Sequence, residues 1–168
     1  MRVAVTGTPG TGKTTATDRV ETALNVVHLS DVIDREGLVT GTDEERDTQV
    51  VDVDALREWF EGQTDVLVES HLAHELPVDR VVVLRCHPEE LERRLRERDE
   101  PAATVTENAE SEALDVILSA AVDRHGLEHV YEVDATDRTP DEVAAEIARV
   151  VAGEREPSAG DVSYIDYL

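Results

Sequence analysis

The stretch "GTPGTGKT", Gly7 to Thr14, matches the pattern G-x-x-x-x-G-K-[ST] at every fixed position. It follows the β-branched run "RVAVT" at 2–6, and a helical pattern continues from Lys13 to about Leu24. This order of strand, loop and helix is the context in which such a loop cradles phosphate groups. Its glycines allow backbone angles at which successive N–H groups point at phosphate oxygens. The sequence therefore predicts binding of a nucleoside triphosphate.

The loop also contains the residues expected to act on the phosphates and a metal ion. Lys13 would reach the β- and γ-phosphates as a mobile cation, and the hydroxyl of Thr14 would ligate Mg²⁺. Lys13 is the single lysine of the chain, since the other 15 of its 16 basic residues are arginines. Its retention at this one position supports a phosphate-binding role. ATP with Mg²⁺ is the expected ligand.

Composition limits the class of protein. The chain has 168 residues, the size of one domain, and its 39 acidic residues against 16 basic ones give a net charge of −23. Such a surface suits a cytoplasm of molar salt, where screening by ions limits electrostatic interactions to short distances. The same screening weakens the charge argument against an RNA-containing partner. The single cysteine, Cys86, excludes an intramolecular disulfide. No apolar run approaches 18 residues and no signal-peptide pattern is present, so we expect a cytoplasmic protein without a membrane or DNA partner.

Hydrophobic patterning predicts an α/β fold with a parallel sheet. Continuous Val- and Leu-rich runs indicate strands buried on both faces, and helical patterns separate them. The five expected strands span 2–6, 25–29, 65–69, 80–85 and 129–133. The expected helices span 13–24, 52–61, 88–98, 108–124 and 139–151, the last with Thr139 as a capping residue. The polar stretches 30–51 and 99–107 are interpreted as excursions from the sheet, and the tail at 153–168 as either disordered or docked.

Residues outside the loop supply further candidates for the site. Glu69 ends the third strand at the position of a Walker B carboxylate, and His71 follows where the chain leaves the sheet. Arg98 closes an arginine-rich helix and would clamp phosphate through its planar fork. The plainer alternatives are a strand-end acid, a packing histidine and a solvated helix face. The remaining histidines show no ligand spacing and are interpreted as structural: His28, His74, His87, His125 and His129.

Several classes of nucleotide-binding protein are excluded. A Ras-like GTPase needs an N-K-x-D motif, which cannot occur when the one lysine lies in the phosphate loop. The length excludes a large motor or AAA-type ATPase. A small nucleotide kinase fits better, because phosphoryl transfer needs a phosphate loop, an acceptor pocket, a metal-orienting carboxylate and a lid against water. The chain offers a candidate for each of these parts.

The chain resembles the archaeal branch of the adenylate kinase isoenzyme 6 family over residues 1 to about 150. The motifs that carry the resemblance are "GTPGTGKTT" at 7–15, "TDEERDTQVVDVDAL" at 42–56, "VESHLAHELPVDRVVVLR" at 68–85, "LERRLRER" at 91–98 and "TENAESEALDVIL" at 106–118. The resemblance implies a P-loop kinase domain over 1–152 with a five-stranded parallel sheet. It also implies phosphoryl transfer from ATP to AMP, often with ATPase activity.

The same resemblance assigns site residues. It makes 30–53 the nucleoside-monophosphate-binding region, 98–108 a short lid and the segment near 137–139 the neighbour of the adenine edge. The catalytic residues would be Lys13, Arg98, Glu69 and His71, the metal ligands Thr14 and Glu69, and the nucleotide-binding residues Gly10, Gly12, Lys13, Thr14, Thr15 and Arg98. The chain departs from the family pattern in three places. The lid lacks a basic residue at 102–104, the Walker B acid is Glu69 rather than aspartate, and Asp34 stands where a basic residue could have met AMP.

The resemblance leaves two functions open. In the first, the protein is an ATP-dependent AMP kinase with associated ATPase activity and a role in maturation of the small ribosomal subunit. In the second, it is a ribosome-assembly ATPase switch in which AMP phosphorylation is incidental, with a small-subunit platform protein and a pre-rRNA particle as partners. A third reading, a regulator that binds nucleotide without turnover, would require Lys13 or Glu69 to be catalytically idle.

Overall fold

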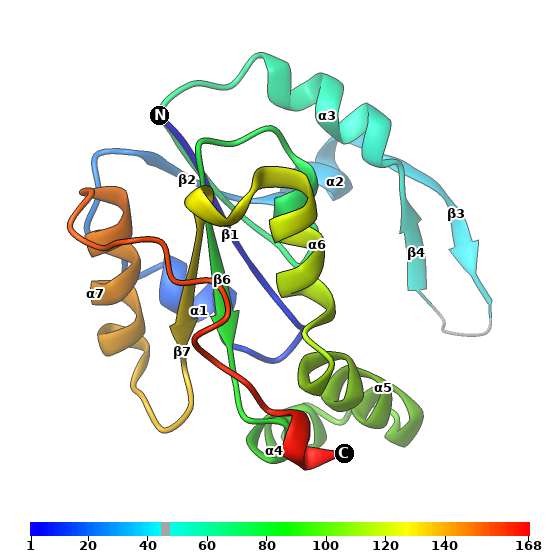
Figure 1. The fold of residues 1–168 in the computed structure, drawn as a ribbon. Helices are drawn as coiled ribbons and strands as arrows, with labels where there is room; N and C mark the ends of the chain where they lie inside the picture. The colour runs from blue at the N-terminus through cyan, green and yellow to red at the C-terminus, as the bar shows by residue number, and fades with distance from the viewer. Residues whose placement is uncertain (45–47) are drawn as a thin grey trace.

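The computed structural model describes residues 1–44 and 48–168 and contains a five-stranded parallel sheet in the order β2-β5-β1-β6-β7 (Figure 1). The predicted α/β class with five parallel strands is therefore confirmed, and each expected strand is within one residue of its observed bounds. The strands of this sheet are β1 (Arg2–Gly7), β2 (Asn25–His28), β5 (Val66–Glu69), β6 (Arg80–Arg85) and β7 (Val130–Asp134).

Helices connect the strands in the crossover pattern that parallel pairing requires. They are α1 (Lys13–Thr17), α2 (Leu29–Glu36), α3 (Val53–Glu61), α4 (Pro88–Glu97), α5 (Ala102–Ala113), α6 (Val116–His125) and α7 (Pro140–Val151). Short 3-10 turns lie at Ala73–Glu75, Leu127–His129 and Ile165–Tyr167. Within the described parts of the chain, no helix is both long and apolar enough to cross a membrane.

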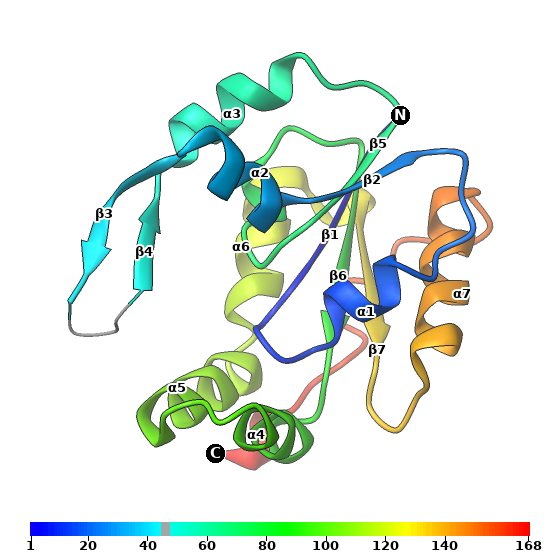
Figure 2. The ribbon, with the colours of Figure 1, turned by 180° about the vertical axis from the view of Figure 1, so that it is seen from behind.

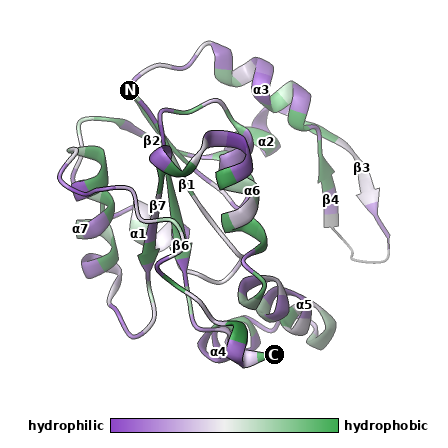
Figure 3. Ribbon diagram, in the orientation of Figure 1, coloured by the Kyte–Doolittle hydropathy of each residue, from purple (hydrophilic) through white to green (hydrophobic). Residues whose placement is uncertain are grey.

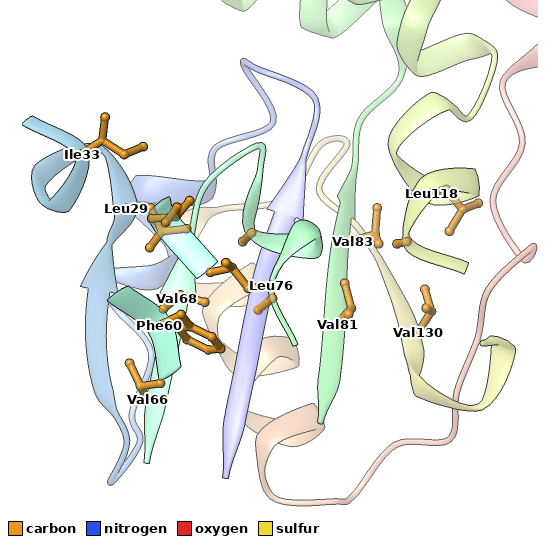
Figure 4. Close-up of a cluster of buried hydrophobic side chains, with 14 residues drawn as sticks. Leu29, Ile33, Phe60, Val66, Val68, Leu76, Val81, Val83, Leu118 and Val130 are labelled. Atoms are coloured by element: carbon orange, nitrogen blue, oxygen red, sulfur yellow. The ribbon is translucent and has the colours of Figure 1, made fainter. Parts of the chain in front are cut away.

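Both faces of the sheet are buried, as its continuous apolar strands predict. Successive strand residues point to opposite faces, so Val66 and Val68 lie in one core and Leu67 lies in the other. The first core is closed by α3 and α6 (Figure 4). The second is closed by α1 and α7, which lie in front of the sheet in Figure 2. The helices are correspondingly two-sided, with polar residues on their outer surfaces (Figure 3).

Local capping explains where several helices begin. The side chain of Asp52 accepts a hydrogen bond from the backbone N–H of Ala55 at the start of α3, at 3.1 Å. Thr139 accepts from the N–H of Glu142 at 3.2 Å, with Pro140 in the first turn of α7. Each cap satisfies a backbone donor that would otherwise have no partner. The capping residue predicted at Thr139 is confirmed.

The first helix is shorter than predicted. The pattern from Lys13 to about Leu24 suggested a long helix, but α1 ends at Thr17. The hydroxyl of Thr17 donates to the carbonyl of Lys13 at 2.8 Å and also approaches that of Thr14 at 3.1 Å. A threonine hydroxyl that bonds back to the preceding turn competes with the helix and weakens it. The helical prediction was wrong beyond this point.

The predicted helix over 108–124 and the irregular stretch over 99–107 also need correction. Helix α5 already begins at Ala102 and ends at Ala113, and Asp115 then takes a left-handed backbone angle, with φ of 55°, before α6 begins. Asp115 accepts from the guanidinium of Arg85 at 2.5 Å. The pattern of apolar residues continues across the break, so the sequence gives no sign of it. The break coincides with an ion pair to a distant strand, which the sequence does not reveal.

The stretch after β2 forms helix α2 and then the antiparallel strands β3 (Val39–Asp43) and β4 (Thr48–Val51). This hairpin projects away from the main sheet (Figure 1). Residues 45–47, which belong to the acidic stretch of the predicted acceptor region, lie outside the described residues.

The C-terminal tail is docked against the sheet and against α4. The backbone N–H of Ser158 donates to the carbonyl of Val130 at 3.1 Å, and the N–H of Gly160 donates to Glu132 at 2.5 Å. Near the end of the chain, the hydroxyl of Tyr167 donates to Glu92 on α4. The tail therefore runs along β7 and reaches α4.

Candidate functional site

The glycines of the phosphate loop adopt the backbone angles predicted for them. Gly10 and Gly12 have φ angles of 96° and 90°, in the region that favours glycine. A Cβ on Gly10 would also lie 2.9 Å from a methyl carbon of Leu91, so a side chain there would collide with α4. The loop therefore turns tightly between β1 and α1 and packs directly against α4.

Lys13 lies at the base of this loop with a single hydrogen bond to the described residues. Its Nζ donates to the carbonyl of Thr8 at 3.1 Å, and the side chain is buried. Burial lowers the pKa of Lys13 from 10.5 to about 8, although the nearby carboxylates of Glu69 and Glu112 partly oppose the shift. A buried ammonium that lacks a paired carboxylate is suited to receive a phosphate.

Glu69 stands at the end of β5 and contacts the loop directly. Its Oε1 accepts from the hydroxyl of Thr14 at 2.9 Å and from Nδ1 of His28 at 2.7 Å. The other ring nitrogen of His28 contacts Asp18 at 2.7 Å. Burial opposes a charge on the imidazole, but these two hydrogen bonds outweigh it and raise the pKa of His28. Sequence reasoning had interpreted His28 as structural, and the parallel register that pairs His28 with Glu69 is a signal that spacing does not carry.

One cavity of about 620 Å³ collects every residue that the sequence predicted for the site. His71 is exposed on the wall of this cavity. Desolvation by the protein around the ring lowers the pKa of His71, and the positive charge of Lys13 lowers it further. Arg98, the residue that caps the end of α4, also lines the cavity, and 59% of its side chain is exposed. The predicted residues on the wall are Gly10, Gly12, Lys13, Thr14, Thr15, Glu69, His71 and Arg98.

The far wall of the same cavity comes from the excursion after β2. It consists of Ser30, Ile33 and Asp34 of α2 and Gln49 and Val51 of β4. The guanidinium of Arg35 points away and contacts Glu36 instead, at 3.4 Å. The cavity thus lies between the phosphate loop and the excursion formed by α2 and β4.

A smaller cavity of about 210 Å³ lies on the other side of the loop. Arg94 enters its wall and approaches the carbonyls of Gly10 and Ala135, each at 3.4 Å. Arg138, from the connection between β7 and α7, and Pro140, the first residue of α7, complete this wall. The segment 137–139 therefore lies beside the phosphate loop, next to a space that opens from Gly12 and Thr15.

A buried ion network lies behind the loop. Arg85, at the end of β6, is fully buried and donates to Glu112 of α5 at 3.2 Å and to Glu132 of β7 at 2.7 Å. Glu112 in turn accepts from the hydroxyl of Thr8 in the phosphate loop at 3.2 Å. Sequence reasoning missed this network, because a lone arginine in an apolar strand carries no signal of its partners. It joins α5, the sheet and the phosphate loop.

The residues present fit a Mg²⁺ ion. Thr14 and Glu69 bring two oxygen ligands within hydrogen-bonding distance of each other at the edge of the cavity. Mg²⁺ in phosphate-transfer sites is held by one or two protein oxygens, substrate phosphates and water rather than by a closed protein cage. Accordingly, no group of three or more His, Cys, Asp or Glu residues forms a metal cage among residues 1–44 and 48–168.

The parallel sheet and the phosphate loop give the chain a P-loop fold of the kind found in small kinases. Solved structures of similar shape include a shikimate kinase from Bacteroides thetaiotaomicron, with a TM-score of 0.60 and 16% identity, covering 91% of this chain and 98% of that one. A gluconokinase from Sinorhizobium meliloti has a TM-score of 0.52 at 17% identity, covering 92% and 97%. At these identities the likeness concerns the fold alone.

Sequence relatives give the family. A protein described as "Putative adenylate kinase" from Halobacterium salinarum is 60% identical over the full length of both chains, and one from Natronomonas pharaonis is 58% identical. A relative with the same description from Pyrococcus abyssi is 41% identical over 90% of this chain and 84% of its own. The chain therefore belongs to this archaeal adenylate kinase family. Residues 3–115 also match the AAA domain family. The length of the chain therefore does not exclude a P-loop domain of this family, contrary to the expectation from the sequence.

Proposed function

We propose that this protein transfers the γ-phosphate of ATP to AMP. The observation that carries the proposal is the single cavity in which the phosphate loop faces α2 and the β3–β4 hairpin. Such a cavity can hold a phosphate donor on one wall and an acceptor on the other. The relatives described as adenylate kinases support AMP as the acceptor.

On the donor wall, Lys13 and Arg98 would neutralise negative charge on the transferring phosphoryl group. Loop amides around Gly10 and Gly12 would hold the β-phosphate, and Thr14 and Glu69 would hold Mg²⁺. The bound metal supplies additional positive charge at the β- and γ-phosphates. The smaller cavity beside Arg94 would take the adenine ring, because it opens from the same loop and is bordered by the segment 137–139.

On the acceptor wall, an oxygen of the AMP phosphate would attack the γ-phosphorus while the bond to the bridging oxygen of ATP breaks, which yields two ADP. No covalent enzyme intermediate is required, because the acceptor phosphate is already a nucleophile. His71 would serve as a neutral hydrogen-bonding group, since its pKa is lowered. Excluding water would fall to the segment 98–108.

The test follows isotope-labelled AMP in molar KCl with ATP and Mg²⁺. The label should appear in ADP, with two ADP formed for each AMP consumed, and Lys13→Met should abolish the conversion. Phosphate release that is indifferent to AMP, with no label in ADP, would overturn the proposed kinase activity.

We propose ATP hydrolysis as a secondary activity of the same site. The exposed side chain of Arg98 favours it, because a lid residue open to solvent excludes water poorly. The resemblance to the isoenzyme 6 family further suggests a cytoplasmic role in maturation of the small ribosomal subunit. Phosphate release measured with and without small ribosomal subunits tests this, and a rate that does not change would count against it.

A further inference from the structure

His28 occupies an unusual position relative to the proposed metal site. It ends β2, and Glu69 ends the neighbouring strand β5, in a register that sets the two residues side by side. Both residues therefore lie at the carboxyl edge of the sheet, where parallel α/β folds bind their ligands. The side chain of His28 is largely buried, and that of Glu69 is almost completely so.

Hydrogen bonds link Thr14, Glu69, His28 and Asp18 in a closed circuit at this edge, with three links between side chains and one between backbone atoms. Thr14 donates to Glu69 at 2.9 Å, Glu69 contacts His28 at 2.7 Å, and His28 contacts Asp18 at 2.7 Å. Asp18 returns to Thr14 through α1, since its backbone N–H donates to the Thr14 carbonyl at 3.1 Å. Because both ring nitrogens of His28 face carboxylate oxygens, the ring is fixed in orientation from both sides.

This circuit leaves one oxygen of Glu69 without a hydrogen bond from residues 1–44 and 48–168. Both hydrogen bonds to the carboxylate end on Oε1, and Oε2 makes none with the described residues, although Glu69 lines the cavity. Glutamate has one more rotatable bond than aspartate, so its carboxylate needs more restraint to hold one position. The contact from His28 supplies that restraint.

We propose that His28, held by Asp18, is a positioning residue that fixes the carboxylate of Glu69 so that Oε2 faces the magnesium site. The inference rests on the proposed function in one respect, the assignment of Glu69 to Mg²⁺. Partners that orient a metal ligand in this way typically contribute 10- to 100-fold to metal affinity or activity. His28 would thus offset the longer side chain at the Walker B position.

The test measures Mn²⁺ binding to the protein–ATP complex by electron paramagnetic resonance, which requires no turnover. His28→Val keeps a good strand residue but removes the donor, and it should weaken Mn²⁺ binding about tenfold or more. His28→Asn keeps a donor near the Nδ1 position and should recover most of the affinity. His129→Val, half-exposed at the far end of the sheet, is the matched control and should bind Mn²⁺ like the wild type.

A double-substitution cycle sharpens the test. In a Glu69→Asp background the carboxylate is shorter, so adding His28→Val should cost little further affinity. If His28→Val binds Mn²⁺ within twofold of the wild type, the proposal is wrong. If that variant does not fold, His28→Asn against His28→Gln decides, since Gln places its donor too far out, and equal affinities would refute the proposal. Failure of the kinase reaction would instead appear as missing ADP in the wild type and would leave this comparison intact.

Discussion

Two cavities lie at opposite ends of the parallel sheet, and the one without the phosphate loop is larger, at about 910 Å³ against about 620 Å³. The larger cavity lies at the amino ends of the strands, between α3 and the end of α6. Arginine side chains line both. Whether the charged groups already have partners, rather than the size of the space, separates a structural cavity from a candidate site.

In the larger cavity the cations are already satisfied. Arg57 and Arg124 both donate to the same oxygen of Glu75, each at 2.9 Å. Arg2 donates to the backbone carbonyls of Gln63 and Glu61, and the amino terminus pairs with Asp65 at 2.9 Å. These contacts tie α3 and α6 to the 3-10 turn at Ala73–Glu75 and tie β1 to the end of α3.

In the cavity beside the phosphate loop, the cationic side chains have few partners among the described residues. Among residues 1–44 and 48–168, Lys13 donates one hydrogen bond, to a backbone carbonyl, and the carboxylate nearest to the Arg98 guanidinium is that of Glu100, at 4.0 Å. The negative charges of a bound triphosphate would give both side chains an anionic partner. Four substitutions measure how far this contrast between the two ends holds.

Arg85→Met should have the largest effect, because it breaks the buried network behind the phosphate loop. Removing the guanidinium leaves Glu112 and Glu132 buried without their partner, which typically costs about 3–5 kcal/mol. Thermal unfolding in molar KCl should show a melting temperature lower by about 10 °C or more. A loss of stability below about 1 kcal/mol would equal that expected for Arg124→Gln at the other end of the sheet, and the two ends would not differ in how strongly their ion pairs stabilise the fold.

Lys13→Met should reduce turnover about 10²- to 10³-fold, as the loss of a transition-state charge contact does. The same variant should be more stable without nucleotide at pH 7, by up to about 3 kcal/mol, because burial lowers the pKa of Lys13 to about 8. In the unfolded chain this lysine binds its proton more tightly, so wild-type stability from this group rises between pH 8 and 10.5. The advantage of the variant should therefore shrink when unfolding is measured at pH 10. A variant less stable than the wild type at pH 7 would contradict this.

Asp34→Asn should lower the KM for AMP about two- to fivefold with little change in kcat, because it removes a negative charge from the acceptor wall; the gain is modest for an exposed charge in high salt. Asp31→Asn, on the same helix but away from the cavity wall, is the control. An unchanged KM for Asp34→Asn would place the AMP phosphate elsewhere.

Arg124→Gln should have the smallest effect. The side chain is partly exposed and shares Glu75 with Arg57, so its loss should cost below about 1 kcal/mol. Turnover should stay within twofold of the wild type. A large loss of activity would give the larger cavity a functional role and undo the contrast.

Sequence reasoning could predict what depends on neighbours along the chain. The strands, the phosphate loop and the cap at Thr139 are local patterns, and the order of strands and helices implies the parallel sheet. Glu69, His71 and Arg98 were found because each stands at the end of a recognisable element. Glu69 and His71 meet the phosphate loop because parallel strands end at the same edge, and α4 brings Arg98 to the same cavity.

What sequence reasoning missed depends on pairing between distant residues. The role of His28 follows from the register of β2 and β5, and the break between α5 and α6 follows from the ion pair of Asp115 with Arg85. The early end of α1 follows from the hydroxyl of Thr17, which helical periodicity does not weigh. Periodicity counts apolar positions and is blind to such polar contacts.

The most direct test of the central claim is calorimetric titration of a non-hydrolysable ATP analogue with Mg²⁺ into the wild type, Lys13→Met and Arg124→Gln in molar KCl. We predict one site per chain, with binding strongly weakened in Lys13→Met and unchanged in Arg124→Gln. Binding that survives in Lys13→Met and is lost in Arg124→Gln would place the nucleotide at the opposite end of the sheet and contradict the account.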